Sequence, residues 1–336
     1  MKIVASILSG ATNVERSTIR SFYNGLLHYY AARFNLSINE KTEHKLKKHH
    51  NIELVLSYDT EFTECDLAVI YGSTKERSAQ HHVTKQNLLK VSKAHICIET
   101  PLLGRTVKSI ADYDYYRIGI NGFLYKQGIF HGELTDKTRL DLLKENLGFS
   151  FTGWRPNPQG HILLLTQLPG DASLRDQNHA EWLIETIRQV RNLTDQKILV
   201  RMHPALSEKG RVEFLNSMSP LLLKNYSNVE FNDGHSSTLQ EDLSNAKVCV
   251  SYTSGSSIDS ILAGVPVIAI DQGNFAYDIS SNLITDIENP RMASHAEVTN
   301  WLNSLCNSQW SLKEMHQGLP QSQLMPEVEE LLCMTL

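Results

Sequence analysis

Short apolar runs alternate with amphipathic stretches along almost the whole chain. The apolar runs have the length and composition of buried strands, as in residues 95–100 (HICIET) and 247–252 (KVCVSY). The stretches between them carry apolar residues at helical spacing, as in residues 17–34 and 177–193. Strands buried on both faces and joined by helices form parallel sheets, because a parallel connection needs a crossover. The alternation therefore predicts an α/β fold with doubly wound sheets.

The strand and helix series runs twice. A connection rich in Pro, Asn and Gln is expected at residues 148–160, and 336 residues is about the length of two domains of roughly 150 residues. We predict two Rossmann-like domains that face a cleft, residues 1–150 and residues 151–336, with the last helices in the second domain. The predicted strands are 2–8, 52–57, 65–73, 95–100, 161–167, 197–204, 228–233, 247–252 and 265–271. The predicted helices are 17–34, 83–93, 137–147, 177–193, 210–223, 239–246, 256–264, 297–306 and 327–332.

The composition is typical of a globular cytoplasmic protein. Hydrophobic residues make up 41% and charged residues 21% of the chain, and no apolar run approaches the ~20 residues that span a bilayer. We therefore expect no membrane insertion, and we interpret the apolar N-terminus as a core strand and not a signal peptide. The five cysteines are scattered without a CxxC pair, which indicates a reduced compartment and no zinc site.

The net charge of -5 argues against a dedicated DNA-binding protein. Residues 41–50 (KTEHKLKKHH) are nevertheless locally basic. Such a stretch is either a solvated helix face or loop, or a contact with a phosphate backbone.

The segment 247–271 (KVCVSYTSGSSIDSILAGVPVIAID) is the most informative for function. A predicted strand runs into a small polar loop, and a short helix begins there. Small residues at a helix N-terminus leave N–H groups that can hold an anion, and an acid in the first turn can accept hydrogen bonds from a diol. The alternative is a plain N-cap with an acid that complements the helix dipole. The candidate ligand residues of this loop are Thr253, Ser254, Gly255, Ser256, Ser257 and Asp259.

Two further strand ends carry polar residues. Arg201 and His203 close the strand 197–204, where a guanidinium group would suit a phosphate. Gln167, Asp171 and Ser173 follow the strand 161–167, in a segment that could equally be an ordinary Pro-Gly turn.

Residues 160–290 resemble the nucleotide-sugar-binding half of GT-B glycosyltransferases. The resemblance rests on R-x-H-P, on S-x-T-S-G-S-S-x-D and on the following G-x-P-V-I strand. It looks closest to capsule and teichoic-acid type transferases. In those families the acid is commonly Glu and contacts the ribose of the donor, whereas this chain has the shorter Asp259. The resemblance implies a nucleotide-sugar donor, preferably UDP-linked, and no metal or other cofactor.

A resemblance over nearly the whole chain points to the acceptor. IETPLLGR, GINGF, LLLTQLPGDASL, GNFAYDISS and WSLKEMHQGLP look like elements of phage-encoded glycosyltransferases associated with DNA base hypermodification. The resemblance implies transfer to a hydroxymethylated pyrimidine, such as hydroxymethylcytosine, in phage DNA, inside the host cytoplasm. A base in a duplex would then have to be flipped out.

Sugar transfer also needs a base and a binding site on the acceptor side. Glu99, at the end of strand 95–100, is the candidate general base, and the alternative is an ion pair with Arg105 or Arg117. Two loops complete the candidate site on the acceptor or sugar side. They contribute Ser9, Gly10 and Thr12 after the first strand, and Asn274, Tyr277 and Asp278 after strand 265–271.

Three other functions stay open from the residues. A GT-B transferase could act on a surface glycan or a lipid-linked acceptor. A sugar-nucleotide epimerase shares the double-Rossmann architecture, although we find no convincing set of acids and bases for it. A non-catalytic nucleotide-binding module could keep the same phosphate and ribose elements.

Overall fold

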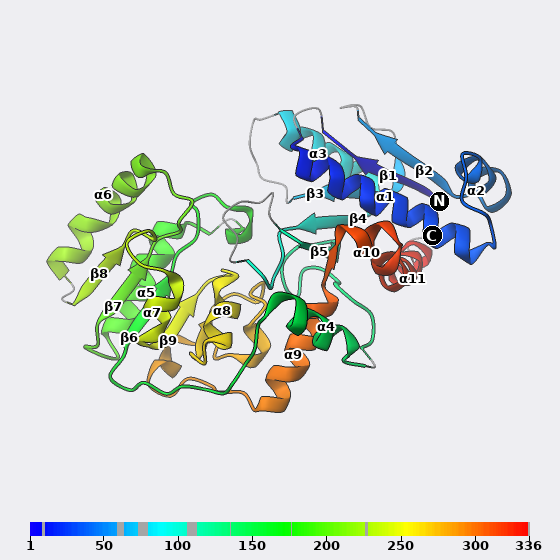
Figure 1. Ribbon diagram of the computed structural model, residues 1–336. Helices are drawn as coiled ribbons and strands as arrows, with labels where there is room; N and C mark the ends of the chain where they lie inside the picture. The colour runs from blue at the N-terminus through cyan, green and yellow to red at the C-terminus, as the bar shows by residue number, and fades with distance from the viewer. Residues whose placement is uncertain are drawn as a thin grey trace. The chain divides into compact units, whose positions relative to one another are not determined.

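The computed structural model describes residues 1–8, 11–58, 64–72, 80–105, 113–134, 136–175, 177–225 and 228–334 (Figure 1). The chain divides into two compact units. Each is built around a sheet with helices packed on it, so the predicted α/β class with two Rossmann-like domains is confirmed. Unit 1 comprises Met1–Phe123, Gln127–Leu147 and Leu302–Leu336, and unit 2 comprises Leu124–Lys126 and Gly148–Trp301.

The sheet of unit 1 has the strand order β11-β5-β4-β3-β1-β2. Strands β1 to β4 are parallel, whereas β5 is antiparallel to β4 and β11 is antiparallel to β5. The chain therefore leaves β1 toward β2 on one side and continues from β3 to β4 on the other. The strands are β1 (Lys2–Ser6), β2 (Glu53–Ser57), β3 (Cys65–Tyr71), β4 (Ser92–Glu99), β5 (Tyr115–Ile120) and β11 (Gln309–Ser311).

Both faces of this sheet are buried, because successive strand residues point to opposite sides. Ile3 and Val69 belong to the larger core, which includes α1, whereas Val4 and Ala68 belong to a second core that includes Leu88 of α3. The helices of unit 1 are α1 (Asn13–Arg33), α2 (Thr42–His50), α3 (Gln80–Val91), α4 (Thr138–Leu147), α10 (Leu312–His316) and α11 (Leu319–Met334).

The C-terminal helices α10 and α11 pack against α1 in unit 1 (Figure 1). Gly25 of α1 allows this close approach, since a Cβ there would lie 1.9 Å from the Met315 carbonyl oxygen. The chain returns to unit 1 within α9 (His295–Asn307). Apart from Leu124–Lys126, unit 2 begins at Gly148, directly after α4, and residues 302–336 lie in unit 1.

The tyrosine-rich stretch before residue 120, where we predicted no strand, contains strand β5. Tyr116 is 2% exposed and packs in the larger core of unit 1. The locally basic stretch forms α2, which buries Thr42 and Leu46 and leaves most of its lysines exposed. Exposed lysines on a helix fit both of the alternatives that we gave for this stretch.

The sheet of unit 2 is parallel throughout, with the order β10-β9-β6-β7-β8. Helices α5 and α6 pack on the face that carries Ile162 and Leu164, and α8 contacts β9 and β10. The strands are β6 (His161–Leu165), β7 (Ile198–Arg201), β8 (Val229–Asn232), β9 (Ala246–Ser251) and β10 (Val267–Ala269). The helices are α5 (His179–Arg191), α6 (Glu208–Asn225), α7 (Leu239–Ser244) and α8 (Ser256–Leu262), with short 3-10 turns at Ala172–Leu174, Tyr277–Ile279 and Ile284–Glu288.

Among the described residues, no helix is long and apolar enough to cross a membrane.

Candidate functional site

The strand order of unit 2 has a switch point between β6 and β9. From β6 the chain proceeds to β7 on one side, and it later crosses to β9 on the other side. Open parallel sheets of this kind bind ligands outside the carboxyl ends of the strands at such a point. The loops that follow β6 and β9 are therefore where a ligand is expected in unit 2.

Gln167 joins these two loops. Its side chain is nearly inaccessible, with the residue 5% exposed. The amide oxygen of Gln167 accepts from the Thr253 N–H at 3.0 Å, and its amide nitrogen donates to Thr253 Oγ1 at 2.9 Å and Ser173 Oγ at 2.7 Å. Ser173 Oγ in turn donates to Asp171 Oδ1 at 2.8 Å. Four residues predicted from the sequence therefore form one hydrogen-bonded bridge at the switch point.

The serine-rich loop differs from our expectation of free N–H groups. The Ser254 N–H donates to Ser251 Oγ at 3.2 Å, and the Ser256 N–H donates to Ser254 Oγ at 3.3 Å. The Ser257 N–H donates to the Ser254 carbonyl at 3.2 Å. The small residues therefore fold the loop by satisfying its own backbone, and Gly255 caps α8 without a side-chain hydrogen bond.

Ser254, Gly255, Ser256 and Asp259 remain half-buried, whereas Ser257 is fully buried. Asp259 lies in the first turn of α8. Burial raises the pKa of the neighbouring Cys249 thiol to about 12, and the Asp259 carboxylate adds to that rise.

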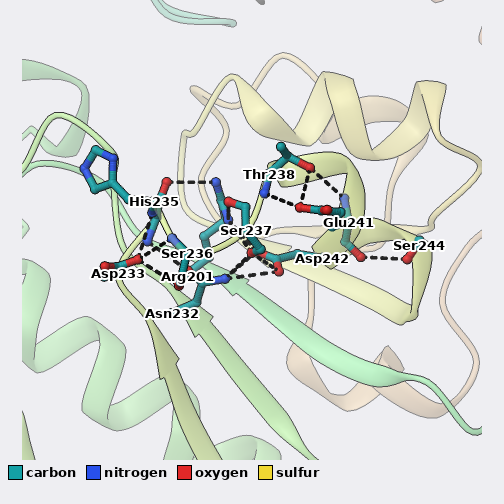
Figure 2. Close-up of polar contacts among 11 residues, drawn as sticks. Arg201, Asn232, Asp233, His235, Ser236, Ser237, Thr238, Glu241, Asp242 and Ser244 are labelled. Carbon is teal, nitrogen blue, oxygen red and sulfur yellow. Dashed lines mark hydrogen bonds and ion pairs between the residues drawn. The ribbon is translucent and has the colours of Figure 1, made fainter.

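Arg201 lies in a buried ion pair at the end of β7 (Figure 2). Its Nη1 is 2.5 Å from Asp242 Oδ2 and also donates to the Ser237 carbonyl at 3.1 Å, and its Nη2 donates to the Gly234 carbonyl at 3.2 Å. The side chains of Arg201 and Asp242 are 9% and 6% exposed. We expected Arg201 to contact an anionic ligand; in the structure its charge is already paired, so an anion would compete with Asp242.

The same network fixes the turn after β8 (Figure 2). Asn232 Nδ2 donates to Asp242 Oδ2 at 3.0 Å, and the Gly234 N–H donates to Asn232 Oδ1 at 2.9 Å. Gly234 has a φ of 81°, and a Cβ there would lie 2.5 Å from the Met202 carbonyl oxygen. Hydrogen bonds from the backbone N–H groups of His235 and Ser236 lower the pKa of Asp233 to about 2.

Two histidines lie near the ends of β6 and β7. His203 is half-buried, and its Nδ1 accepts from the Ala205 N–H at 3.1 Å. His179, at the start of α5, is 4% exposed, and its Nε2 accepts from the Gln167 N–H at 3.2 Å. Burial, with a smaller contribution from His203, lowers the pKa of His179 to about 4. His179 is therefore a neutral side chain, and its hydrogen bond holds the backbone of Gln167 just after β6.

The loop after β10 splits into a buried part and an exposed part. Asn274 is completely buried, and its Oδ1 accepts from Ser257 Oγ at 2.7 Å while its Nδ2 donates to the Tyr252 carbonyl at 3.1 Å. Asn274 therefore does not lie open to the acceptor or sugar contact that we predicted for it, because its amide is already hydrogen-bonded within the loop.

Tyr277 and Asp278 keep the accessibility expected of them. Tyr277 is half-buried and Asp278 is exposed. Asp278 forms an ion pair with Lys126 at 2.6 Å and accepts from the Tyr125 hydroxyl at 2.6 Å. Although partial burial opposes it, these two groups hold the pKa of Asp278 below its usual value.

In unit 1, Glu99 ends β4 and is paired with Arg117, with 3.7 Å between Glu99 Oε2 and Arg117 Nη2. This is one of the two ion pairs that we weighed against a role as general base. Thr12 caps α1 in a reciprocal arrangement with Glu15, which explains the threonine locally. The predicted Ser9 and Gly10 lie outside the described residues.

Sequence reasoning missed three polar residues at the carboxyl edges of the sheets. Arg175 is exposed and paired with Asp271 at 2.8 Å in unit 2. His179 lies at helical spacing from Trp182, and Lys85 of unit 1 lies at helical spacing from Leu88. A polar residue on an apolar helix stripe is the signal that would have identified both.

Within the described residues, no group of three or more His, Cys, Asp or Glu side chains is arranged to hold a metal ion.

No protein-family model and no curated protein matches the chain. Similar solved structures include KpsC, the beta Kdo 2,7 transferase of Thermosulfurimonas dismutans, with 15% identity, a TM-score of 0.47 and coverage of 96% of this chain and 99% of that chain. A glycosyltransferase from Rickettsia africae ESF-5 has 10% identity, a TM-score of 0.31 and coverage of 98% of both chains. The UDP-GlcNAc 2-epimerase from Neisseria meningitidis has 10% identity, a TM-score of 0.25 and coverage of 98% of this chain and 100% of that chain. Similarities of this size do not identify an activity.

Proposed function

We propose that the chain is a GT-B type glycosyltransferase that uses a nucleotide sugar, preferably a UDP-linked one. The proposal is carried by the polar bridge at the switch point of the unit 2 sheet, where Gln167 joins Thr253 and Ser173. Parallel sheets with this strand order bind nucleotides at that point. The bridge ties together the two loops that follow the neighbouring strands β6 and β9.

The donor would lie along the loops after β6 and β9. Asp259 would accept hydrogen bonds from the ribose diol, as the resemblance to GT-B transferases implies. Ser254, Gly255 and Ser256, which are half-buried, would line the diphosphate. The pair of Arg201 with Asp242 is buried, whereas Arg175 is exposed although it pairs with Asp271. We therefore assign His203 and Arg175 to the leaving diphosphate.

In the transfer, the bond between the anomeric carbon and the diphosphate oxygen breaks, and an acceptor oxygen takes its place at that carbon. The acceptor proton passes to a general base, for which Glu99 is our candidate. The leaving charge is stabilised by donors and cations of the protein, so we propose that the reaction needs no metal.

The acceptor that we carry forward is a hydroxymethylated pyrimidine in DNA, and this choice rests on the whole-chain sequence resemblance alone. A surface glycan or a lipid-linked acceptor is the alternative. A sugar-nucleotide epimerase is distinguished by its product, because it changes the donor without transferring a sugar.

The test is a panel of UDP-, GDP-, CDP- and ADP-sugars, each incubated with the full chain without added metal. The acceptors are DNA with and without 5-hydroxymethylcytosine, and mass spectrometry of the nucleosides is the readout. We expect one UDP-sugar to be consumed and a sugar mass to appear on the modified base. Donor hydrolysis without DNA modification would move the acceptor to glycans, and a donor isomer would identify an epimerase. If no nucleotide sugar is bound or consumed, the proposal fails.

Asp259→Asn tests the donor site in the same assay. We expect it to raise the KM for the donor about tenfold with little change in kcat, because it weakens a hydrogen bond to an ionised group. Asp195→Asn is the matched control, since Asp195 is exposed in the loop before β7, at the opposite edge of the sheet. An unchanged KM in Asp259→Asn would remove Asp259 from the donor site.

A further inference from the structure

Unit 1 has a switch point of its own, between β1 and β3. A small cavity lies there, with Ser6 at the end of β1, Glu15 of α1, Tyr71 at the end of β3 and Lys85 of α3 among its lining residues. It leaves room for about one water-sized group. The residues of this cavity all belong to unit 1, whereas the loops assigned to the donor belong to unit 2.

Lys85 brings a buried positive charge to this cavity. The residue is 7% exposed, and its Nζ lies beside Gly72, where a Cβ would be 3.2 Å from Nζ and 3.7 Å from Glu99 Oε1. Among the described residues, the ammonium group makes no hydrogen bond or ion pair. Burial lowers the pKa of Lys85, and the carboxylates of Glu15 and Glu99 offset only part of this effect.

Two hydroxyl groups that border the cavity also lack partners. Ser6 is 5% exposed, and its Oγ is buried without a hydrogen-bond partner among the described residues. The Tyr71 hydroxyl is also buried without a hydrogen-bond partner among the described residues. Buried polar groups are nearly always hydrogen-bonded in proteins, so unpaired hydroxyls beside an unpaired ammonium group indicate a missing ligand or water.

The carboxylates near the cavity, Glu15 and Glu99, are each held by another group. Glu15 accepts from the Thr12 N–H at 2.6 Å in the capping box of α1. Glu99 is paired with Arg117 at 3.7 Å and accepts from the Thr100 N–H at 3.0 Å. Both carboxylates are therefore held by other groups, and neither makes an ion pair with Lys85, although both act on its charge from a distance. The N-terminus of α1 adds partial positive charge nearby.

We propose that the cavity at the switch point of unit 1 binds one oxygen of an anionic group, either a carboxylate or a phosphate. Lys85 supplies the opposite charge, and the hydroxyls of Ser6 and Tyr71 are the neighbouring donors. Charge-assisted hydrogen bonds of this kind are short and strong. This site does not depend on the sugar transfer proposed above, and it would select ligands that carry an acidic group.

The test is thermal unfolding of the full chain in increasing sodium phosphate or sodium acetate, with the ionic strength held constant by sodium chloride. We expect at least one of the two anions to raise the Tm saturably, and the one that does so identifies the chemical class. Lys85→Met should lower the apparent affinity at least about tenfold. Lys90→Met is the matched control, because Lys90 is exposed on the same helix and should leave the affinity unchanged.

Ser6→Ala and Tyr71→Phe each remove one donor and should weaken the affinity several-fold. They keep the proposal testable if Lys85→Met does not fold. An equal Tm response in the wild type and in the three cavity variants would overturn the proposal. The absence of a saturable response to both anions would also overturn it, and the cavity would then hold water only.

Discussion

At the scale of single residues, His179 shows how burial determines a protonation state in this molecule. Its Nε2 must be unprotonated to accept the Gln167 N–H at 3.2 Å. Its ring stacks on Trp182, with 5.6 Å between the ring centroids. The imidazole is therefore held as a neutral acceptor at the end of β6, and protonation would break the hydrogen bond that positions Gln167.

The stability of the chain should depend on pH through His179. An unfolded histidine titrates near 6.5, whereas burial lowers the pKa of His179 to about 4. Between these values the unfolded state binds the proton, so stability is present above pH 6.5 and is lost as the pH falls toward 4. Lowering the pH from 7 to 5 should cost about 2 kcal/mol of unfolding free energy through this residue.

Urea unfolding at several pH values measures this effect. His179→Gln keeps a hydrogen-bond acceptor without the titration, so its loss of stability between pH 7 and pH 5 should be smaller than that of the wild type. His44→Gln, at an exposed position of α2, should behave as the wild type. Identical slopes in the wild type and His179→Gln would show that His179 does not carry the effect.

The residues of the switch-point bridge could be predicted from the sequence, because Gln167 and Thr253 follow strands that neighbour each other in a parallel sheet. The role of Arg201 could not. Its partner Asp242 lies 41 residues further along the chain, in α7, and nothing in the R-x-H-P pattern reveals it. Asn274 was misjudged for the same reason, since Ser257 and Tyr252 satisfy its amide only after folding.

At the scale of elements, the ion pair between Arg201 and Asp242 ties the end of β7 to α7. Both side chains are buried, and Asn232 at the end of β8 donates to the same carboxylate. Three elements thus meet in one polar network. A buried pair of this kind costs little to replace as a whole, whereas removal of one partner leaves a buried charge.

Arg201→Met should lower the unfolding free energy by about 3 to 5 kcal/mol, because Asp242 is left buried and unpaired. The double variant Arg201→Met with Asp242→Leu should be more stable than Arg201→Met alone. Urea unfolding measures both. Lys209→Met is the control, since its pair with Glu213 is exposed and should contribute less than about 1 kcal/mol. A double variant less stable than the single one would contradict this account.

The elements that the sequence did not reveal are the short or polar ones. Strand β5 contains Tyr115, Tyr116 and Gly119, and we predicted no strand in that segment. Strand β11 has only the residues Gln309–Ser311, too few for a periodic pattern. Both strands are antiparallel additions to the parallel sheet of unit 1, and the alternation of strands and helices carries no information about them.

At the scale of the whole molecule, the C-terminal segment completes unit 1. Gln309 is completely buried, and its Oε1 accepts from the N–H groups of Leu102 and Leu103 at 2.9 Å each. Arg139 is paired with Glu314 at 2.6 Å, and Gln321 Nε2 donates to the Phe22 carbonyl at 2.7 Å. Hydrophobic periodicity predicted a helix at residues 327–332, within α11, but it did not show which core this helix covers.

This arrangement predicts how the chain can be divided. The fragment 148–301 contains the complete unit 2 sheet and should unfold cooperatively on its own. The fragment 1–147 lacks β11, α10 and α11, so the core residues that pack against Trp310 and Met325 would be exposed, and it should show no cooperative transition. Joining residues 302–336 to residue 147 through a flexible Gly-Ser linker should restore that transition, because the linker lets the segment dock on α1.

Circular dichroism during thermal unfolding measures all three fragments, and the fragment 148–336 is the control, in which residues 302–336 should add no stability to unit 2. A cooperative transition in the fragment 1–147 alone would show that the C-terminal segment only decorates a unit that is already complete.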